Sequence, residues 1–190
     1  MKKDMILCGV GGQGILSIAT VIGEAATATG LNLKQAEVHG MSQRGGDVQS
    51  NLRLSTEEIF SDLIPRGQAD LIISMEPMEA LRYLPYLSAG GRVVTASKPF
   101  VNIPDYPEEA DVIAELKALP HVSMLDIDTI ALENKMPKGA NMILLGMMAP
   151  YLEIVTPEAL REAIARVFAA KGEAVVASNQ LAFDLGFNAQ

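Results

Sequence analysis

The stretch MILCGVGGQG, residues 5–14, decides the fold. It begins with a short, continuous apolar run, Met5 to Val10, which is typical of a strand buried on both faces of a parallel sheet. A G-x-G-x-x-G pattern follows, made by Gly9, Gly11 and Gly14. Apolar residues then recur with helical spacing and predict a helix from about Ile15 to Thr29. A strand, a glycine-rich turn and a helix in this order indicate an α/β fold.

The glycine-rich turn, completed by Gly12 and Gln13, is suited to a phosphate-bearing ligand, because backbone N–H groups at a helix start attract anions. A dinucleotide site also needs an acidic residue near the end of the second strand, to hold ribose hydroxyls. Glu37, 23 residues beyond Gly14, is close to that place. The alternative is that the glycines only let the helix pack closely on the sheet. The residues alone leave both interpretations open.

A second glycine-flanked segment, HGMSQRGG at residues 39–46, follows the strand expected at 32–38. Its arginine offers a planar fork of donors that matches a carboxylate or a phosphate. The simpler alternative is an exposed turn arginine without a partner. We expect the two strands to be neighbours, so that both glycine segments lie at one edge of the sheet, where α/β proteins bind ligands. The candidate binding residues of this segment are His39, Gly40, Ser42, Gln43, Arg44, Gly45 and Gly46.

The remaining pattern completes the expected fold. Alternation at 48–54 predicts a strand with one solvated face, and residues 55–58 predict a hairpin turn into residues 59–60. Further strands are expected at 70–75, 93–96 and 122–127, helices at 76–84 and 111–119, a turn at Gly90–Gly91 and a surface loop at 97–107. From residue 141 onward the pattern is helical, with Thr156 as an N-cap. We therefore expect a three-layer, Rossmann-like α/β sandwich with a mostly parallel, partly mixed sheet and C-terminal helices, in one domain spanning 1–190.

The composition excludes several classes of function. Hydrophobic residues make up 49 % of the 190 residues and the net charge is −8 without any run of Lys or Arg, which argues against disorder and a nucleic-acid footprint. The single cysteine, Cys8, cannot form an internal disulfide or hold a metal cluster alone, and it fits a reducing cytoplasm. The longest apolar stretch, 142–152, is shorter than the ~20 residues that span a bilayer. We expect a cytoplasmic protein without a membrane segment.

The catalytic inventory is thin. No serine stands in a nucleophile elbow, and the two histidines, His39 and His121, are not spaced as a metal pair. Glu76 is expected at the start of a helix, where the helix dipole explains an acidic residue without any function. We predict no catalytic and no metal-binding residue in this chain. Two ligand-binding loops without a catalytic set indicate a subunit that handles a cofactor or substrate for a partner.

Several motifs resemble one family. The opening GVGGQG and the segment EVHGMSQRGG at 37–46 are similar to the gamma domain of the pyruvate/2-oxoacid ferredoxin oxidoreductases. The form GMSQRGG resembles the indolepyruvate branch, since the pyruvate and 2-oxoglutarate enzymes tend to carry a Gly-Pro version of this loop. The stretches IPRGQAD (64–70), EPMEALRY (76–83) and NQLAF (179–183) agree. The resemblance therefore covers nearly the whole chain as a single gamma-type domain.

The resemblance implies a large catalytic alpha subunit that holds thiamine diphosphate and iron–sulfur clusters. Such an enzyme oxidatively decarboxylates an aryl 2-oxoacid to an acyl-coenzyme A and reduces ferredoxin. By match, residues 11–14 and 44–46 contribute to the coenzyme A side, with coenzyme A as a substrate and no cofactor held by this chain alone. The chain is then a hetero-oligomer subunit that is inactive by itself, with the partner interface at Pro99–Pro107 or the C-terminal helices.

Two other functions stay open from the residues. The first is a stand-alone NAD(P)- or nucleotide-binding oxidoreductase that uses the first glycine loop as a Rossmann site. The second is a scaffold without a ligand, in which the glycines serve packing alone. The sequence does not specify which 2-oxoacid is used.

Overall fold

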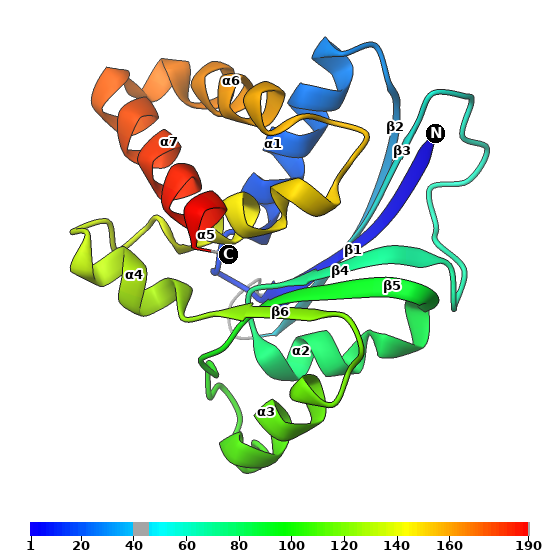
Figure 1. Ribbon diagram of the computed structural model, residues 1–190, viewed down its shortest axis with the longest axis vertical. Helices are drawn as coiled ribbons and strands as arrows, with labels where there is room; N and C mark the ends of the chain where they lie inside the picture. The colour runs from blue at the N-terminus through cyan, green and yellow to red at the C-terminus, as the bar shows by residue number, and fades with distance from the viewer. Residues whose placement is uncertain (40–45, 190) are drawn as a thin grey trace.

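The computed structural model describes residues 1–39 and 46–189, and a six-stranded sheet forms its centre (Figure 1). The strand order is β2-β3-β1-β4-β5-β6. β1, β4, β5 and β6 run parallel to one another, and β3 pairs antiparallel with both β1 and β2. The prediction of a mostly parallel, partly mixed sheet is confirmed. The strands are β1 (Lys2–Val10), β2 (Asn32–His39), β3 (Asp47–Ser55), β4 (Ala69–Ser74), β5 (Leu87–Ala96) and β6 (Val122–Leu125).

Helices cover both faces of this sheet (Figure 1). One layer holds α1 (Ile15–Ala28), α5 (Ala140–Met148), α6 (Pro157–Phe168) and α7 (Glu173–Asn188). The other holds α2 (Pro77–Arg82) and α3 (Glu109–Lys117), while α4 (Ile127–Glu133) follows β6. Side chains of β1 alternate between the layers: Met5 and Leu7 belong to the core under α1 and α5, whereas Ile6 and Cys8 belong to the core under α2 and α3. Burial on both faces explains the continuous apolar run.

Local signals placed several helix ends correctly. α1 is capped at its carboxyl end by Thr29, and Gly30 follows with φ +77°, a conformation that favours glycine. Thr156 caps α6, because its hydroxyl accepts a hydrogen bond of 3.2 Å from the Ala159 N–H. Glu76 caps α2 in the same way and is fully buried. Glu76 therefore stands at the start of a helix, as expected.

The predicted hairpin into residues 59–60 is wrong. β3 instead pairs with β2, from Asn32 opposite Ser55 to His39 opposite Val48. Residues 56–68 form no strand, and Arg53 holds part of this segment. Its guanidinium donates two hydrogen bonds, of 2.8 and 2.9 Å, to the buried Asp4 carboxylate. It also donates to the carbonyl oxygens of Ser61 and Leu63.

Two further boundaries differ from the prediction. The glycines at 90 and 91 lie inside β5 and not in a turn before it. The last parallel strand ends at Leu125, because the Asp126 carboxylate accepts the Thr129 N–H at 3.0 Å and starts α4 at Ile127. Among the described residues, no helix is long and apolar enough to cross a membrane.

Candidate functional site

The two glycine segments meet at the carboxyl edge of the sheet, although their strands are not neighbours. β3 lies between β1 and β2, so the expectation that these strands are adjacent is wrong. Both still end at the same edge, since both run antiparallel to β3. The Gly11 N–H donates a 2.8 Å hydrogen bond to the carbonyl oxygen of Gly46, the last residue before β3. Gly46 thus links the end of the second segment directly to the first.

The first loop depends on glycine at two positions. Gly12 has φ +105° and Gly14 has φ +82°, where any side chain would strain the backbone. Gly14 is the N-cap of α1, and its carbonyl oxygen accepts a 3.2 Å hydrogen bond from the Asn141 side chain at the start of α5. The described residues offer no acceptor to the N–H groups of Ile15 and Leu16, the first two of α1. The helix start can therefore receive an anion.

Gln13 holds the loop together through its side chain. Its Oε1 accepts a 2.8 Å hydrogen bond from the Val10 N–H, and its Nε2 donates to the Met75 carbonyl oxygen at 3.3 Å. The same amide fills the space where a Cβ on Gly9 would lie, 2.9 Å from Gln13 Oε1. Both ends of the Gln13 amide are occupied within the protein. Gln13 and Gly9 therefore shape the turn from inside the protein.

Gln13→Leu is expected to lower the free energy of unfolding by about 1–3 kcal/mol, because the Val10 N–H then loses its acceptor in a nearly buried place. Chemical denaturation of the isolated chain measures the change. Gln13→Glu is the matched variant, since it keeps an acceptor for the Val10 N–H but faces the Met75 carbonyl oxygen without a donor. We expect Gln13→Glu to lose less stability than Gln13→Leu. Equal stability of all three proteins would contradict this role for Gln13.

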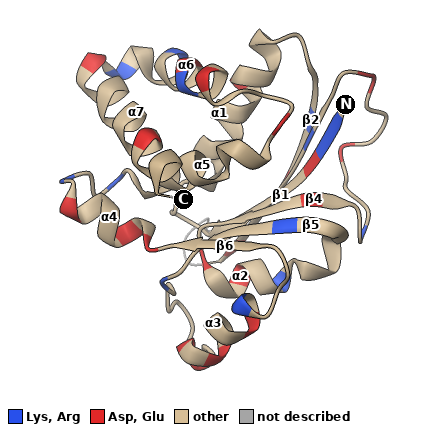
Figure 2. Ribbon diagram, viewed as in Figure 1, with Lys and Arg blue, Asp and Glu red and all other residues tan. Residues whose placement is uncertain are grey.

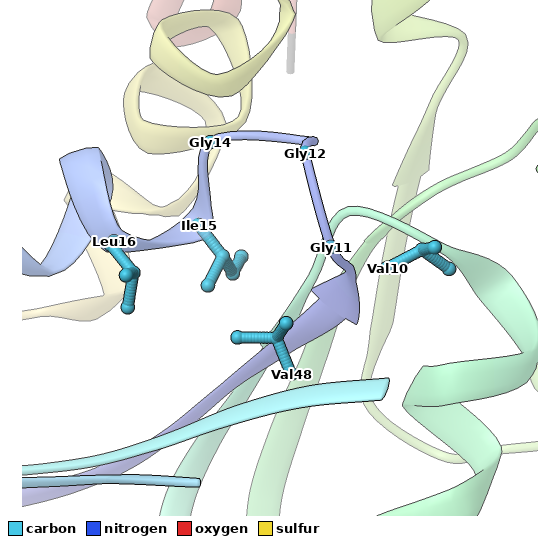
Figure 3. Close-up of a pocket in the computed structure, with 7 residues that line it drawn as sticks. All are labelled: Val10, Gly11, Gly12, Gly14, Ile15, Leu16 and Val48. Carbon is cyan, nitrogen blue, oxygen red and sulfur yellow. The ribbon is translucent and has the colours of Figure 1, made fainter. Parts of the chain in front are cut away.

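A pocket of about 200 Å³ opens beside the loop (Figure 3). Ile15 and Val48 face one another across it, and Leu16 lies alongside on the first turn of α1 (Figure 3). The pocket combines apolar walls with the backbone of the turn. It can therefore hold an apolar chain next to an anionic group at the helix start. Its lining residues are Val10, Gly11, Gly12, Gly14, Ile15, Leu16 and Val48.

Glu37 is not positioned as the acidic residue of a dinucleotide fold. It lies opposite Ser50, which lies opposite Leu7, so Glu37 is level with the middle of β1 and two strand spacings away, about 10 Å. Its carboxylate accepts a 2.6 Å hydrogen bond from Gln35, which also bonds the Ser50 hydroxyl. Glu37 is thus an exposed residue on an edge strand, and its hydrogen bond with Gln35 accounts for its carboxylate without a ligand.

The second segment is described only at its ends. The His39 backbone pairs with Val48, and Gly46 contacts Gly11. The other candidates of this segment lie outside the described residues, and their binding role stays a prediction: Gly40, Ser42, Gln43, Arg44 and Gly45. Within 1–39 and 46–189, no group of three His, Cys, Asp or Glu side chains is arranged to hold a metal ion.

Sequence reasoning missed two residues that support the site. Asn141 holds Gly14 from 127 positions away, and Asp47 directly after Gly46 accepts a 2.6 Å hydrogen bond from the Tyr83 hydroxyl. Their partners Gly14 and Tyr83 stand in the motifs GVGGQG and EPMEALRY, but Asn141 and Asp47 themselves stand in none. Contacts between distant segments leave no local pattern.

Comparison with known proteins gives consistent matches. The family model described as pyruvate ferredoxin/flavodoxin oxidoreductase matches residues 4–189. The indolepyruvate oxidoreductase subunit IorB of Archaeoglobus fulgidus is 34 % identical, over 99 % of this chain and 95 % of the relative. IorB of Pyrococcus horikoshii is 35 % identical, over 100 % and 96 %. The crystal structure of a keto/oxoacid ferredoxin oxidoreductase gamma subunit from Geobacter sulfurreducens is 26 % identical with a TM-score of 0.69, over 97 % of this chain and 96 % of that one.

Proposed function

Since this chain belongs to the pyruvate ferredoxin/flavodoxin oxidoreductase family, we propose that it is the cluster-free subunit of an indolepyruvate ferredoxin oxidoreductase. In the proposed reaction an aryl 2-oxoacid loses carbon dioxide, its acyl group passes to coenzyme A, and the two electrons released reduce ferredoxin. Thiamine diphosphate and iron–sulfur clusters on a large alpha subunit supply the decarboxylation and the electron transfer. A chain with one cysteine, itself fully buried, does not fit such clusters.

Coenzyme A is the substrate that we assign to this chain's own residues. The observation that carries the assignment is the junction of the two glycine segments through Gly11 and Gly46 beside the open start of α1. The N–H groups of Ile15 and Leu16 suit a phosphate oxygen, and the apolar walls of the pocket suit the pantetheine chain. Arg44, two positions before Gly46 in the sequence, is proposed as a further anion contact.

The chain's part in turnover is to bind and orient coenzyme A so that its thiol reaches the acyl group on the catalytic subunit. Holding two reactants in line lowers the entropic barrier to their reaction. No residue of this chain is assigned a catalytic role. A stand-alone NAD(P)-dependent enzyme is not favoured, because β3 separates Glu37 from the glycine loop. We place the complex in the cytoplasm.

We place the proposed partner interface on the two segments expected from the sequence, Pro99–Pro107 and the C-terminal helices. Phe100 and Val101 are 49 % and 68 % exposed in the loop after β5, and Leu181 on α7 is 51 % exposed. Figure 2 shows Lys and Arg dispersed over separate elements, whereas acidic residues recur along α3. A stable subunit interface buries on the order of 1,000 Å² or more in total, which these apolar side chains would help to supply.

Reconstitution tests the proposal. The chain alone is expected to bind no iron and to oxidise no 2-oxoacid, while the chain assembled with its alpha subunit reduces ferredoxin with indolepyruvate in a coenzyme A-dependent way. The measurements are iron content and ferredoxin reduction, with pyruvate and 2-oxoglutarate as competing substrates. Stoichiometric iron on the chain alone would contradict the proposal. So would tight NAD(P) binding by calorimetry, which supports the stand-alone alternative.

A further inference from the structure

The motif EPMEALRY, residues 76–83, has no part in the proposed function so far. It runs from the end of β4 through α2. Its polar side chains form hydrogen bonds within the motif and with two other segments at the carboxyl edge of the sheet. These side chains are Glu76, Glu79, Arg82 and Tyr83, and we call them, with Asp47, the α2 network.

The network reaches the candidate site through Tyr83. This side chain is 7 % exposed, and its hydroxyl donates a 2.6 Å hydrogen bond to Asp47 Oδ2. Asp47 is the first residue of β3 and pairs with Val10, the last residue of β1. The residue before it, Gly46, accepts the hydrogen bond from the Gly11 N–H. Two hydrogen bonds, joined by the peptide bond between Gly46 and Asp47, therefore connect the end of α2 to the glycine loop.

An ion pair between the buried Glu79 and the half-exposed Arg82 fixes the base of the network. The Glu79 carboxylate is almost fully buried, and Arg82 donates to it twice, from Nε at 2.7 Å and from Nη2 at 3.3 Å. Burial raises the pKa of Glu79, the neighbouring Asp47 raises it further, and Arg82 opposes both. Burial and Asp47 also raise the pKa of Tyr83, which keeps its hydroxyl protonated as a donor. The Tyr83 hydroxyl thus satisfies a carboxylate that faces a second acidic group.

The other end of the network holds the loop after β5. Glu76 Oε2 accepts the Glu79 N–H at 2.9 Å, and Glu76 Oε1 accepts hydrogen bonds from the Tyr106 hydroxyl and the Phe100 N–H. Glu76 is fully buried, so these donors replace water around its charge. The α2 network is therefore anchored on both sides of α2, and the helix itself is held in place. When the Tyr83 hydrogen bond is lost, Asp47 is the side that moves.

We propose that Tyr83 is a positioning residue for coenzyme A, which acts through Asp47 and Gly46 on the loop at residues 11–14. The inference rests on the proposed function of that loop. Without the hydroxyl, Asp47 loses the donor that holds it against α2 while the neighbouring Glu79 still repels it, and it turns away from α2. The start of β3 then moves with it, and the Gly46 carbonyl oxygen no longer holds the Gly11 N–H in place. The anion contacts of the loop are weakened, although Tyr83 itself touches no substrate.

Tyr83→Phe tests the proposal in the chain assembled with its alpha subunit. We expect the KM for coenzyme A to rise about 5- to 20-fold. This is less than the roughly 10- to 150-fold effect of losing one hydrogen bond to a charged group, because Tyr83 acts on coenzyme A only through the loop. The kcat and the KM for the 2-oxoacid are expected to stay within about twofold, because a misplaced loop weakens one substrate and not the chemistry. A purely structural role of Tyr83 would instead lower the melting temperature and change all three kinetic parameters together.

Two sets of variants control the experiment. Tyr86→Phe removes the hydroxyl of a neighbouring tyrosine, whose ring centroid lies 6.1 Å from that of Tyr83 but which has no place in the α2 network, and wild-type kinetics are expected. Asp47→Ala is expected to match Tyr83→Phe, and the double variant to add nothing further. Asp47→Asn keeps an acceptor for the hydroxyl and should recover part of the loss. If Tyr83→Phe does not assemble, the two Asp47 variants carry the same measurement.

The outcomes separate this inference from the proposed function. A wild-type complex without saturable coenzyme A dependence would overturn the proposed function and this inference with it. A wild-type complex with that dependence, but with an unchanged coenzyme A KM in Tyr83→Phe or Asp47→Ala, would overturn the inference alone.

Discussion

Arg44→Ala is expected to slow the coenzyme A-dependent step of the assembled enzyme roughly 10- to 150-fold. A charge-assisted contact to a phosphate or carboxylate is worth about 1.5–3 kcal/mol, and about 1.4 kcal/mol corresponds to a factor of ten. Arg44 lies outside the described residues, so the expectation comes from its sequence context between polar residues and two glycines. The measurement is turnover as a function of coenzyme A concentration, beside the melting temperature, which should not change.

Two variants sharpen this test. Arg44→Lys keeps the charge but loses the planar fork, and we expect it to recover activity only in part. Arg66→Ala is a matched control, because Arg66, like Arg44, is followed by a glycine in the sequence. Arg66 is exposed in the segment before β4, at the edge of the sheet opposite the glycine loop. Wild-type kinetics in Arg44→Ala would make Arg44 an exposed turn arginine without a partner. A lower melting temperature would make it a structural residue.

Gly186→Ala is expected to destabilise the chain by about 3 kcal/mol. A Cβ at this position of α7 would overlap the carbonyl oxygen of Ile143 on α5, and a backbone atom cannot rotate away. The helices must separate, although alanine by itself favours a helix over glycine by about 1 kcal/mol. For a chain of this size the loss corresponds to a melting temperature about 6–12 °C lower, measured by calorimetry or circular dichroism.

Gly146, the glycine of α5 at the same helix crossing, allows a double-mutant cycle with Gly186. A Cβ on Gly146 of α5 would overlap the Phe183 carbonyl oxygen of α7, so Gly146→Ala forces the same separation. The double variant should cost clearly less than the sum of the two single changes. Gly90→Ala is the control, because that glycine is exposed in β5 and a Cβ there meets nothing within 4 Å. A Gly186→Ala protein as stable as Gly90→Ala would contradict the close helix crossing.

Local features of the fold could be predicted from the sequence because their causes are local. The apolar run at 5–10 specified a buried strand, glycine at 30 specified a helix end, and Thr156 specified a cap. The position of β3 between β1 and β2 could not be predicted, since strand order depends on contacts between residues such as Ile6 and Asn51 that are far apart in the chain. The predicted hairpin at 55–60 failed because residues 47–55 already pair with β2 on one side and β1 on the other, which leaves β3 no free edge.

The candidate site shows the same division. The positive φ angle at Gly14 falls on a glycine of the G-x-G-x-x-G pattern, whereas Gly12, which also has a positive φ, stands at a variable position of that pattern. The pattern does not reveal that the Gln13 amide is occupied inside the protein, or that Asn141 and Tyr83 support the loop from elsewhere. Their hydrogen bonds depend on where α5 and α2 pack against the sheet. Sequence reasoning therefore found the loop and missed what holds it.

The support of Gly14 by Asn141 has a consequence for the order in which the molecule is completed. During synthesis the glycine loop leaves the ribosome well before the helix that carries Asn141, which follows more than 120 residues later. That helix packs in turn on α7 through Gly146 and Gly186, near the end of the described chain. The glycine loop is thus synthesised before the helices that hold it in its final conformation. Nascent chains that lack α7 are therefore expected to bind coenzyme A poorly, even though their glycine loop is complete.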